Sequence, residues 1–158
     1  MRAQSLRHPG AYAEMRGDKQ MRHIEHEHQK TLFIWWTLEA GRRGINPRLM
    51  WATPNGGFRH MAEARRLKAE GVKAGVPDVF LAIPSQGFHG LFLELKAPKG
   101  RVSPEQSDML DLLRSRGYVG RVCYGWDQAR EAIEGYLGKF IPKINYLTED
   151  KKEFVNLP

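Results

Sequence analysis

The sequence predicts a single α/β domain in which a mixed β-sheet is flanked by helices. Apolar runs of strand length alternate along the chain with segments of helical periodicity. The predicted order is helix, strand, helix, strand, strand, helix, strand, helix, which is typical of a mixed sheet with helices on its faces. At 158 residues the chain is long enough for one domain with a substantial core and short for two.

The composition favours a polyanionic partner in a reducing compartment. Lysine and arginine number 25 against 18 acids, which gives a net charge of +7, and the pI is near 9.7, so nucleic acid is a natural partner. The single cysteine, Cys123, excludes an internal disulfide and is expected to be a buried structural thiol. No run is apolar enough for a membrane span or a secretion signal, so we expect a soluble cytoplasmic protein of a bacterial or phage-infected cell.

The chain divides into a basic arm over residues 1–20, a domain over residues 21–138 and an extension over residues 139–158. Helical spacing predicts a first helix from Met21 to Ala40, ended by Gly41. Its expected inward residues are Ile24, His28, Leu32, Thr31, Trp35, Trp36 and Leu38. Three nearby histidines, His23, His26 and His28, do not have the spacing of a zinc site.

A short strand and a basic helix come next. Residues 47–53 read as a strand with Trp51 in the core, and residues 54–57, Pro-Asn-Gly-Gly, read as a turn. A helix is expected from His60 to Glu70. Its basic face is either a solvated surface or a phosphate contact.

Two apolar runs, Val79 to Ile83 and Leu91 to Leu95, predict a hairpin whose turn is the segment 84–87, Pro-Ser-Gln-Gly. Asp78 begins the first strand. Glu94 and Lys96 fall on one face near the end of the second, because side chains alternate along a strand. Buried carboxylates need a cation or a metal, so this hairpin is either a Mg²⁺ site for phosphodiester hydrolysis or a structural salt bridge.

The remaining elements complete the sheet. Ser103, Pro104 and Gln106 predict a capping box at the start of a helix that runs to about Arg116. Tyr118 to Tyr124 reads as a strand. Asp127 to Tyr136 reads as a helix whose inward residues are Ala129, Ala132, Ile133 and Tyr136.

The motif Pro77-Asp78, followed after fifteen residues by Glu94-Leu95-Lys96, resembles the signature of PD-(D/E)XK nucleases. The surrounding segments EARRLKAEGVKAGVPDVFL, HGLFLELKAPKGRVSPEQ and GYVGRVCYGWDQAREAIEGYL resemble the VRR-NUC domain of virus-type replication and repair nucleases. The resemblance covers about residues 25–137. It implies a restriction-endonuclease-like fold and a DNA endonuclease that depends on Mg²⁺ or Mn²⁺, without an organic cofactor.

The resemblance also implies a role for each residue of the motif. Asp78 and Glu94 would ligate metal, with the Leu95 carbonyl completing the shell. An acid from the first helix, followed by a glutamine, would support a second ion or its waters; here Glu25 and Gln29 have the best spacing, and Glu27 is the competing acid. Lys96 would orient the attacking hydroxide and stabilise charge on the phosphate, while Gln106 would steady the ligands.

The expected partner is DNA. The residues expected to contact it are Asn55, Arg59, Arg65, Arg66, Lys73, Lys99 and Arg101. Stand-alone VRR-NUC proteins of phage type resemble dimeric Holliday-junction resolvases, which implies a homodimer acting on four-way junctions in DNA repair. The alternatives are a flap or non-selective nuclease, a non-catalytic DNA-binding module, and a basic subunit of a larger assembly.

Overall fold

The structure, a computed structural model, describes the backbone of residues 9–53 and 61–138, with side chains in residues 20–53 and 65–138. One four-stranded mixed sheet organises it, with strands in the order β1-β2-β3-β4. Strands β1 (Met50–Ala52), β2 (Val79–Leu81) and β3 (Leu91–Lys96) pair antiparallel, and β4 (Val119–Tyr124) lies parallel to β3. The predicted α/β architecture is confirmed.

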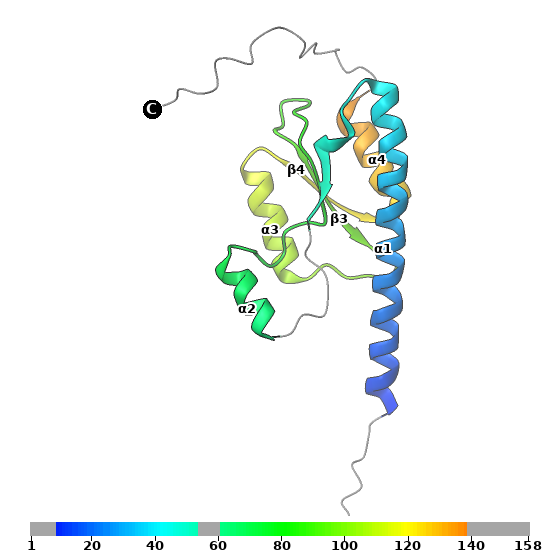
Figure 1. Cartoon of the computed structure of the whole chain (residues 1–158), viewed down its shortest axis with the longest axis vertical. Helices are drawn as coiled ribbons and strands as arrows, with labels where there is room; N and C mark the ends of the chain where they lie inside the picture. Colours follow the sequence, from blue (N-terminus) through cyan, green and yellow to red (C-terminus); the bar gives the residue numbers. More distant parts are fainter. Residues whose placement is uncertain (1–8, 54–60, 139–158) are drawn as a thin grey trace, which may run out of the picture.

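Helices cover both faces of this sheet (Figure 1). Helices α1 (Pro9–Arg43) and α4 (Trp126–Leu137) lie side by side on one face, and α3 (Pro104–Ser115) lies on the other. The short helix α2 (Met61–Ala69) lies between β1 and β2 in the chain. Within the described ranges, no helix has the length and apolar character needed to cross a bilayer.

The core lies between the sheet and the α1–α4 layer. Leu91, Leu93 and Leu95 of β3 are buried there. They pack in one cluster with residues of α1 and α4, namely Leu32, Trp36, Ala40, Ala129, Ile133 and Tyr136. The opposite β3 face carries Glu94 and Lys96, because successive side chains point to opposite faces. The alternation predicted for this strand is therefore confirmed, and it turns a charged pair toward the α3 side.

Helix α1 is longer than the predicted helix at both ends. It begins at Pro9 rather than Met21 and runs through Gly41 to Arg43. Gly44 follows the last helical residue, and its φ of +68° is the left-handed conformation of a C-terminal cap. The Ile45 N–H donates to the Ala40 carbonyl at 2.8 Å. A glycine inside a helix costs only about 1 kcal/mol, which tertiary contacts can offset.

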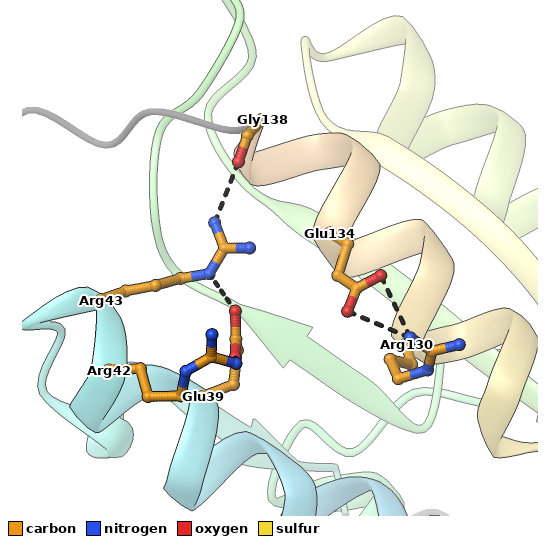
Figure 2. A network of polar contacts seen from close by, with 6 residues as sticks. All are labelled: Glu39, Arg42, Arg43, Arg130, Glu134 and Gly138. Carbon is orange, nitrogen blue, oxygen red and sulfur yellow. Dashed lines mark hydrogen bonds and ion pairs between the residues drawn. The ribbon is translucent and has the colours of Figure 1, made fainter.

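Those contacts form a polar network at the end of α1 (Figure 2). Glu39, which is 8% exposed, accepts from Arg43 at 2.6 Å and from Arg42 at 2.9 Å. Arg43 also donates to the carbonyl of Gly138 at 3.0 Å, at the end of α4. The network ties the C-terminal ends of the two helices together.

Three predicted inward positions are wrong. Thr31 is exposed, and its hydroxyl donates to the Glu27 carbonyl of its own helix at 2.9 Å. Leu38 is 68% exposed, because the inward stripe of α1 is Leu32, Trp36 and Ala40, from which Leu38 is rotated away. Trp51 is 46% exposed, because β1 is an edge strand in which only Met50 is buried. The predicted strand over residues 47–53 is also shorter, since Pro47–Leu49 forms a 3₁₀ turn.

Candidate active site

Antiparallel pairing of β2 and β3 brings together the acids of the hairpin. Asp78 directly precedes β2, and Glu94 lies near the end of β3, where Val79 pairs with Leu93. Asp78 Oδ2 accepts a hydrogen bond from the backbone N–H of Leu95 at 2.8 Å. The pairing thus fixes the Asp78 carboxylate against the backbone that carries Glu94, with the Leu95 side chain buried in the core beneath them.

Glu94 is 1% exposed and its two oxygens have unequal surroundings. Oε1 lies 2.7 Å from Lys96 Nζ and also accepts a hydrogen bond from the Gln106 amide. Oε2 is buried and has no hydrogen-bond partner among the residues that the structure describes. A buried carboxylate oxygen without a donor is costly, so this atom marks a place for a cation.

Gln106 reaches Glu94 because of the local chemistry of the α3 start. Ser103 Oγ accepts from the Gln106 N–H at 3.3 Å, and Gln106 Oε1 accepts from the Ser103 N–H at 2.9 Å. This is the predicted capping box, with Pro104 in the first helical turn. Because the box engages only the amide oxygen, the amide nitrogen remains available to donate to Glu94, and the side chain fulfils both tasks at once.

Helix α1 contributes Glu25. Its Oε1 accepts from the backbone N–H of Ala97 at 3.0 Å, just after β3 ends. Glu27 instead lies on the exposed side of α1, where the hydrogen bond and charge of Lys30, 2.8 Å away, lower its pKa. The structure therefore directs Glu25, and not Glu27, toward the hairpin acids. Within the described part of the chain, no three His, Cys, Asp or Glu side chains already converge as a metal-binding group.

The electrostatics of the hairpin acids are unfavourable in the absence of a cation. Burial raises the pKa of Glu94 to about 7, and repulsion from Asp78 adds to the effect, while Lys96 opposes it. Burial likewise raises the pKa of Asp78, against the hydrogen bond from Leu95 and the charge of Lys96. One ammonium group offsets only part of the cost of the buried Glu94 carboxylate and the half-buried Asp78 carboxylate beside it.

These residues line a cavity of about 480 Å³. Its wall comprises Arg22, Glu25, Ala74, Gly75, Val76, Asp78, Glu94, Lys96, Ser103, Glu105 and Gln106. Gly75 is necessary there, because its φ is +78° and a Cβ would lie 2.2 Å from the Glu105 carbonyl oxygen. Arg22 and Glu105 were not among the residues predicted for the site. Helical spacing could have identified Arg22, because it precedes Glu25 by three residues and so shares its helical face.

None of the described residues that were predicted to contact DNA lines the cavity. Those on α2 and in the flanking loops, Arg65, Arg66, Lys73, Lys99 and Arg101, are exposed, and Arg66 pairs with Glu70 at 2.9 Å. Lys73 directly precedes the lining residue Ala74. Asn55 and Arg59 lie outside the described residues.

A larger cavity, about 920 Å³, lies along β4 and α4, away from the hairpin acids. Of the described residues that line it, only Glu131 is acidic. Cys123 also borders it, but this thiol is 2% exposed and burial raises its pKa to about 11, as suits a structural cysteine. Size alone therefore does not make this cavity the reactive site.

Comparisons with known proteins agree with this geometry. A family model of the VRR-NUC domain matches residues 20–127. A solved structure described as a VRR_NUC domain protein shares the fold, with a TM-score of 0.61 and 27% sequence identity, over 72% of this chain and 88% of that one. No curated protein matches. The chain belongs to the VRR-NUC family, and this membership implies a nuclease of the PD-(D/E)XK type that acts on DNA.

Proposed function

We propose that this protein is a divalent-metal-dependent DNA endonuclease that hydrolyses phosphodiester bonds with Mg²⁺ or Mn²⁺. The observation that carries the proposal is the buried, unpartnered Oε2 of Glu94 beside Asp78, in a cavity that also holds a lysine. A non-catalytic DNA-binding module needs no such atom. A structural salt bridge would be expected to satisfy both carboxylate oxygens of its acid.

The residues present fit a hard divalent cation. Asp78 and Glu94 supply carboxylate oxygens, the kind of ligand that Mg²⁺ prefers, and the Leu95 carbonyl would complete the shell. Glu25 would support a second ion or its waters from the same cavity. When bound, a divalent ion acidifies water and neutralises charge on the phosphate. Its positive charge would also counter the effects of burial and of neighbouring carboxylates, which raise both carboxyl pKa values.

Lys96 and Gln106 act from fixed positions. The Lys96 ammonium, with a side chain 10% exposed, is held 2.7 Å from Glu94 Oε1 and faces the same cavity. There it would orient the attacking hydroxide and stabilise the negative charge that accumulates on the phosphate. Gln106 holds the same Glu94 oxygen, which orients the carboxylate so that Oε2 is directed away from these donors.

The proposed substrate is branched DNA, with the four-way junction first. The family resemblance supports this, and a two-fold homodimer with paired active sites would cut two strands of a junction symmetrically. The net charge of +7 favours association with the densely charged branch point. A flap or non-selective nuclease of the same fold is the second candidate.

The test is to incubate the purified protein with labelled four-way junction, flap, single-stranded and duplex DNA, in Mg²⁺, Mn²⁺ or EDTA, beside Lys96→Ala. We expect symmetric, metal-dependent nicking of the junction that is lost in the variant. Preferential cutting of another form would reject the resolvase assignment and retain the nuclease. Tight binding without cutting in any metal would reject the nuclease.

A further inference from the structure

A third, smaller cavity lies between α1 and the edge strand β1. It measures about 270 Å³, and its lining residues are His26, Gln29, Lys30, Phe33 and Ala52. This is close to the lower limit of small-ligand pockets, roughly 300 Å³. None of these residues belongs to the set that surrounds the hairpin acids.

The lining has the chemistry of a nucleotide site. Phe33 is half-buried and presents an aromatic wall, on which any base can stack. Gln29 is half-buried, and its amide makes no hydrogen bond to any described residue, so it can donate to and accept from a base edge. His26 and Lys30 lie one helical turn apart at the exposed rim, where a phosphate can approach.

Lys30 can be released to a phosphate. Its partner in the structure is Glu27, at 2.8 Å, in a pair whose side chains are 56% and 52% exposed. Exposed pairs of this kind contribute about 0–1 kcal/mol, so exchange of the carboxylate for a phosphate costs little.

Two elements connect the lining of the pocket to the active-site residues. Gln29 follows Glu25 by one helical turn, about 6 Å along the axis of α1, so the two side chains share a face. On the sheet side, Ala52 precedes Thr53, whose N–H donates to the Asp78 carbonyl at 2.7 Å. A strand whose scissile phosphate lay at the hairpin acids would thus carry a neighbouring nucleotide to the pocket.

We propose that this pocket binds one unpaired nucleotide next to the bond that is cut. The identity of the polymer rests on the proposed nuclease function, whereas the pocket is a separate site. An aromatic wall requires a base with an open face, and the free amide can then bond its Watson–Crick edge, whereas pairing and stacking inside a duplex cover both. The preference of the protein for branched DNA is therefore set partly by unpairing at the branch.

The experiment measures binding in EDTA, where no cutting occurs. The probes are a duplex DNA in which 2-aminopurine is paired and a branched DNA in which it is unpaired at the branch, with affinity and fluorescence recorded for each. The variants are Gln29→Ala and Phe33→Leu, the second of which keeps an apolar side chain against the core. The matched control is Gln20→Ala, the same substitution on the opposite, exposed side of α1.

We expect the unpaired probe to bind more tightly and its fluorescence to fall as the base stacks. Gln29→Ala and Phe33→Leu should each weaken that binding roughly tenfold and leave the duplex affinity unchanged, and Gln20→Ala should change neither. Equal losses on both probes, or no loss in Gln29→Ala, would overturn the proposal. If the protein prefers the unpaired probe but cuts no DNA in any metal, the nuclease function is rejected and the pocket is retained. If it cuts DNA but binds both probes equally, the pocket is rejected and the nuclease function is retained.

Discussion

Two buried glutamates of this fold each pair with a basic side chain, and the two pairs have different roles. Glu39 has both carboxylate oxygens occupied, by Arg42 and Arg43, and the second arginine also holds the end of α4 (Figure 2). Glu94 has two donors on one oxygen and none from the described residues on the other. The first pair is closed and structural, whereas the second is left open toward a cavity.

The difference shows how an acid–base pair can be interpreted from its surroundings. A closed pair gains from every donor that satisfies it, so its purpose is to hold elements together. An open pair with a second carboxylate nearby keeps an electrostatic cost, which raises the pKa of Glu94 to about 7. A carboxylate with a raised pKa at a cavity is characteristic of a ligand-binding site.

The largest expected effect distinguishes the two pairs by activity. Lys96→Ala should lower the single-turnover cleavage rate by about 10²–10³-fold, because it removes a preorganised charge from the transition state. Arg43→Ala should leave the rate per folded molecule unchanged, since Arg43 does not line the cavity. Equal loss of cleavage in the two variants would abolish the distinction.

The free energy of unfolding should show the opposite order, with the larger loss in Arg43→Ala than in Lys96→Ala. Arg43→Ala leaves Glu39 buried with one donor and removes the link to Gly138, so the free energy of unfolding should fall by roughly 3 kcal/mol. Urea denaturation at neutral pH measures this. An unchanged midpoint in Arg43→Ala would show that the network in Figure 2 contributes little.

The pH dependence of stability should come from the open pair. The folded-state pKa of Glu94 is about 7, above the ordinary value of 4.5, so between these values the folded state binds the proton more tightly. In metal-free protein, the free energy of unfolding should therefore rise as pH falls from about 7 to 4.5, by on the order of 2 kcal/mol. Asp78, whose pKa is also raised, acts in the same direction.

The control for this slope is Glu94→Gln, which cannot ionise at that position. The difference in unfolding free energy between wild type and Glu94→Gln should change across this pH window and level off above it. A constant difference would mean that Glu94 is not the group that titrates.

The smallest effect concerns the support that α1 gives to the open pair. Glu25→Ala should lower cleavage about tenfold at limiting Mg²⁺, because Glu25 faces the same cavity as the proposed ligands. Glu27→Ala is the matched control on the same helix, and its exposed pair with Lys30 should be nearly silent. An equal mild loss in both variants would remove α1 from the metal site.

Features set by local chemistry could be predicted from the sequence. The β2–β3 hairpin follows from two apolar runs around a turn, and the capping box at Ser103 and Gln106 from four consecutive residues. The position of Asp78 opposite Glu94 follows from strand pairing. These features depend on neighbours in the chain or across one hairpin.

Features set by distant packing could not be predicted. Leu38 and Trp51 are apolar but exposed, since burial depends on which helix face and which sheet edge have a neighbour. The closed pair at Glu39 could not be predicted, because its role depends on the contact between Arg43 and Gly138, which are far apart in the chain.

The central claim is that Asp78 and Glu94 hold a divalent cation, and Mn²⁺ binding to DNA-free protein tests it most directly. Titration followed by calorimetry or electron paramagnetic resonance should show binding to wild type that is lost in Asp78→Asn and retained in Glu27→Ala. Binding should also strengthen as pH rises through about 7, because Glu94 must lose its proton to coordinate the ion. Absence of binding in the folded wild type, or unchanged affinity in Asp78→Asn, would contradict the claim.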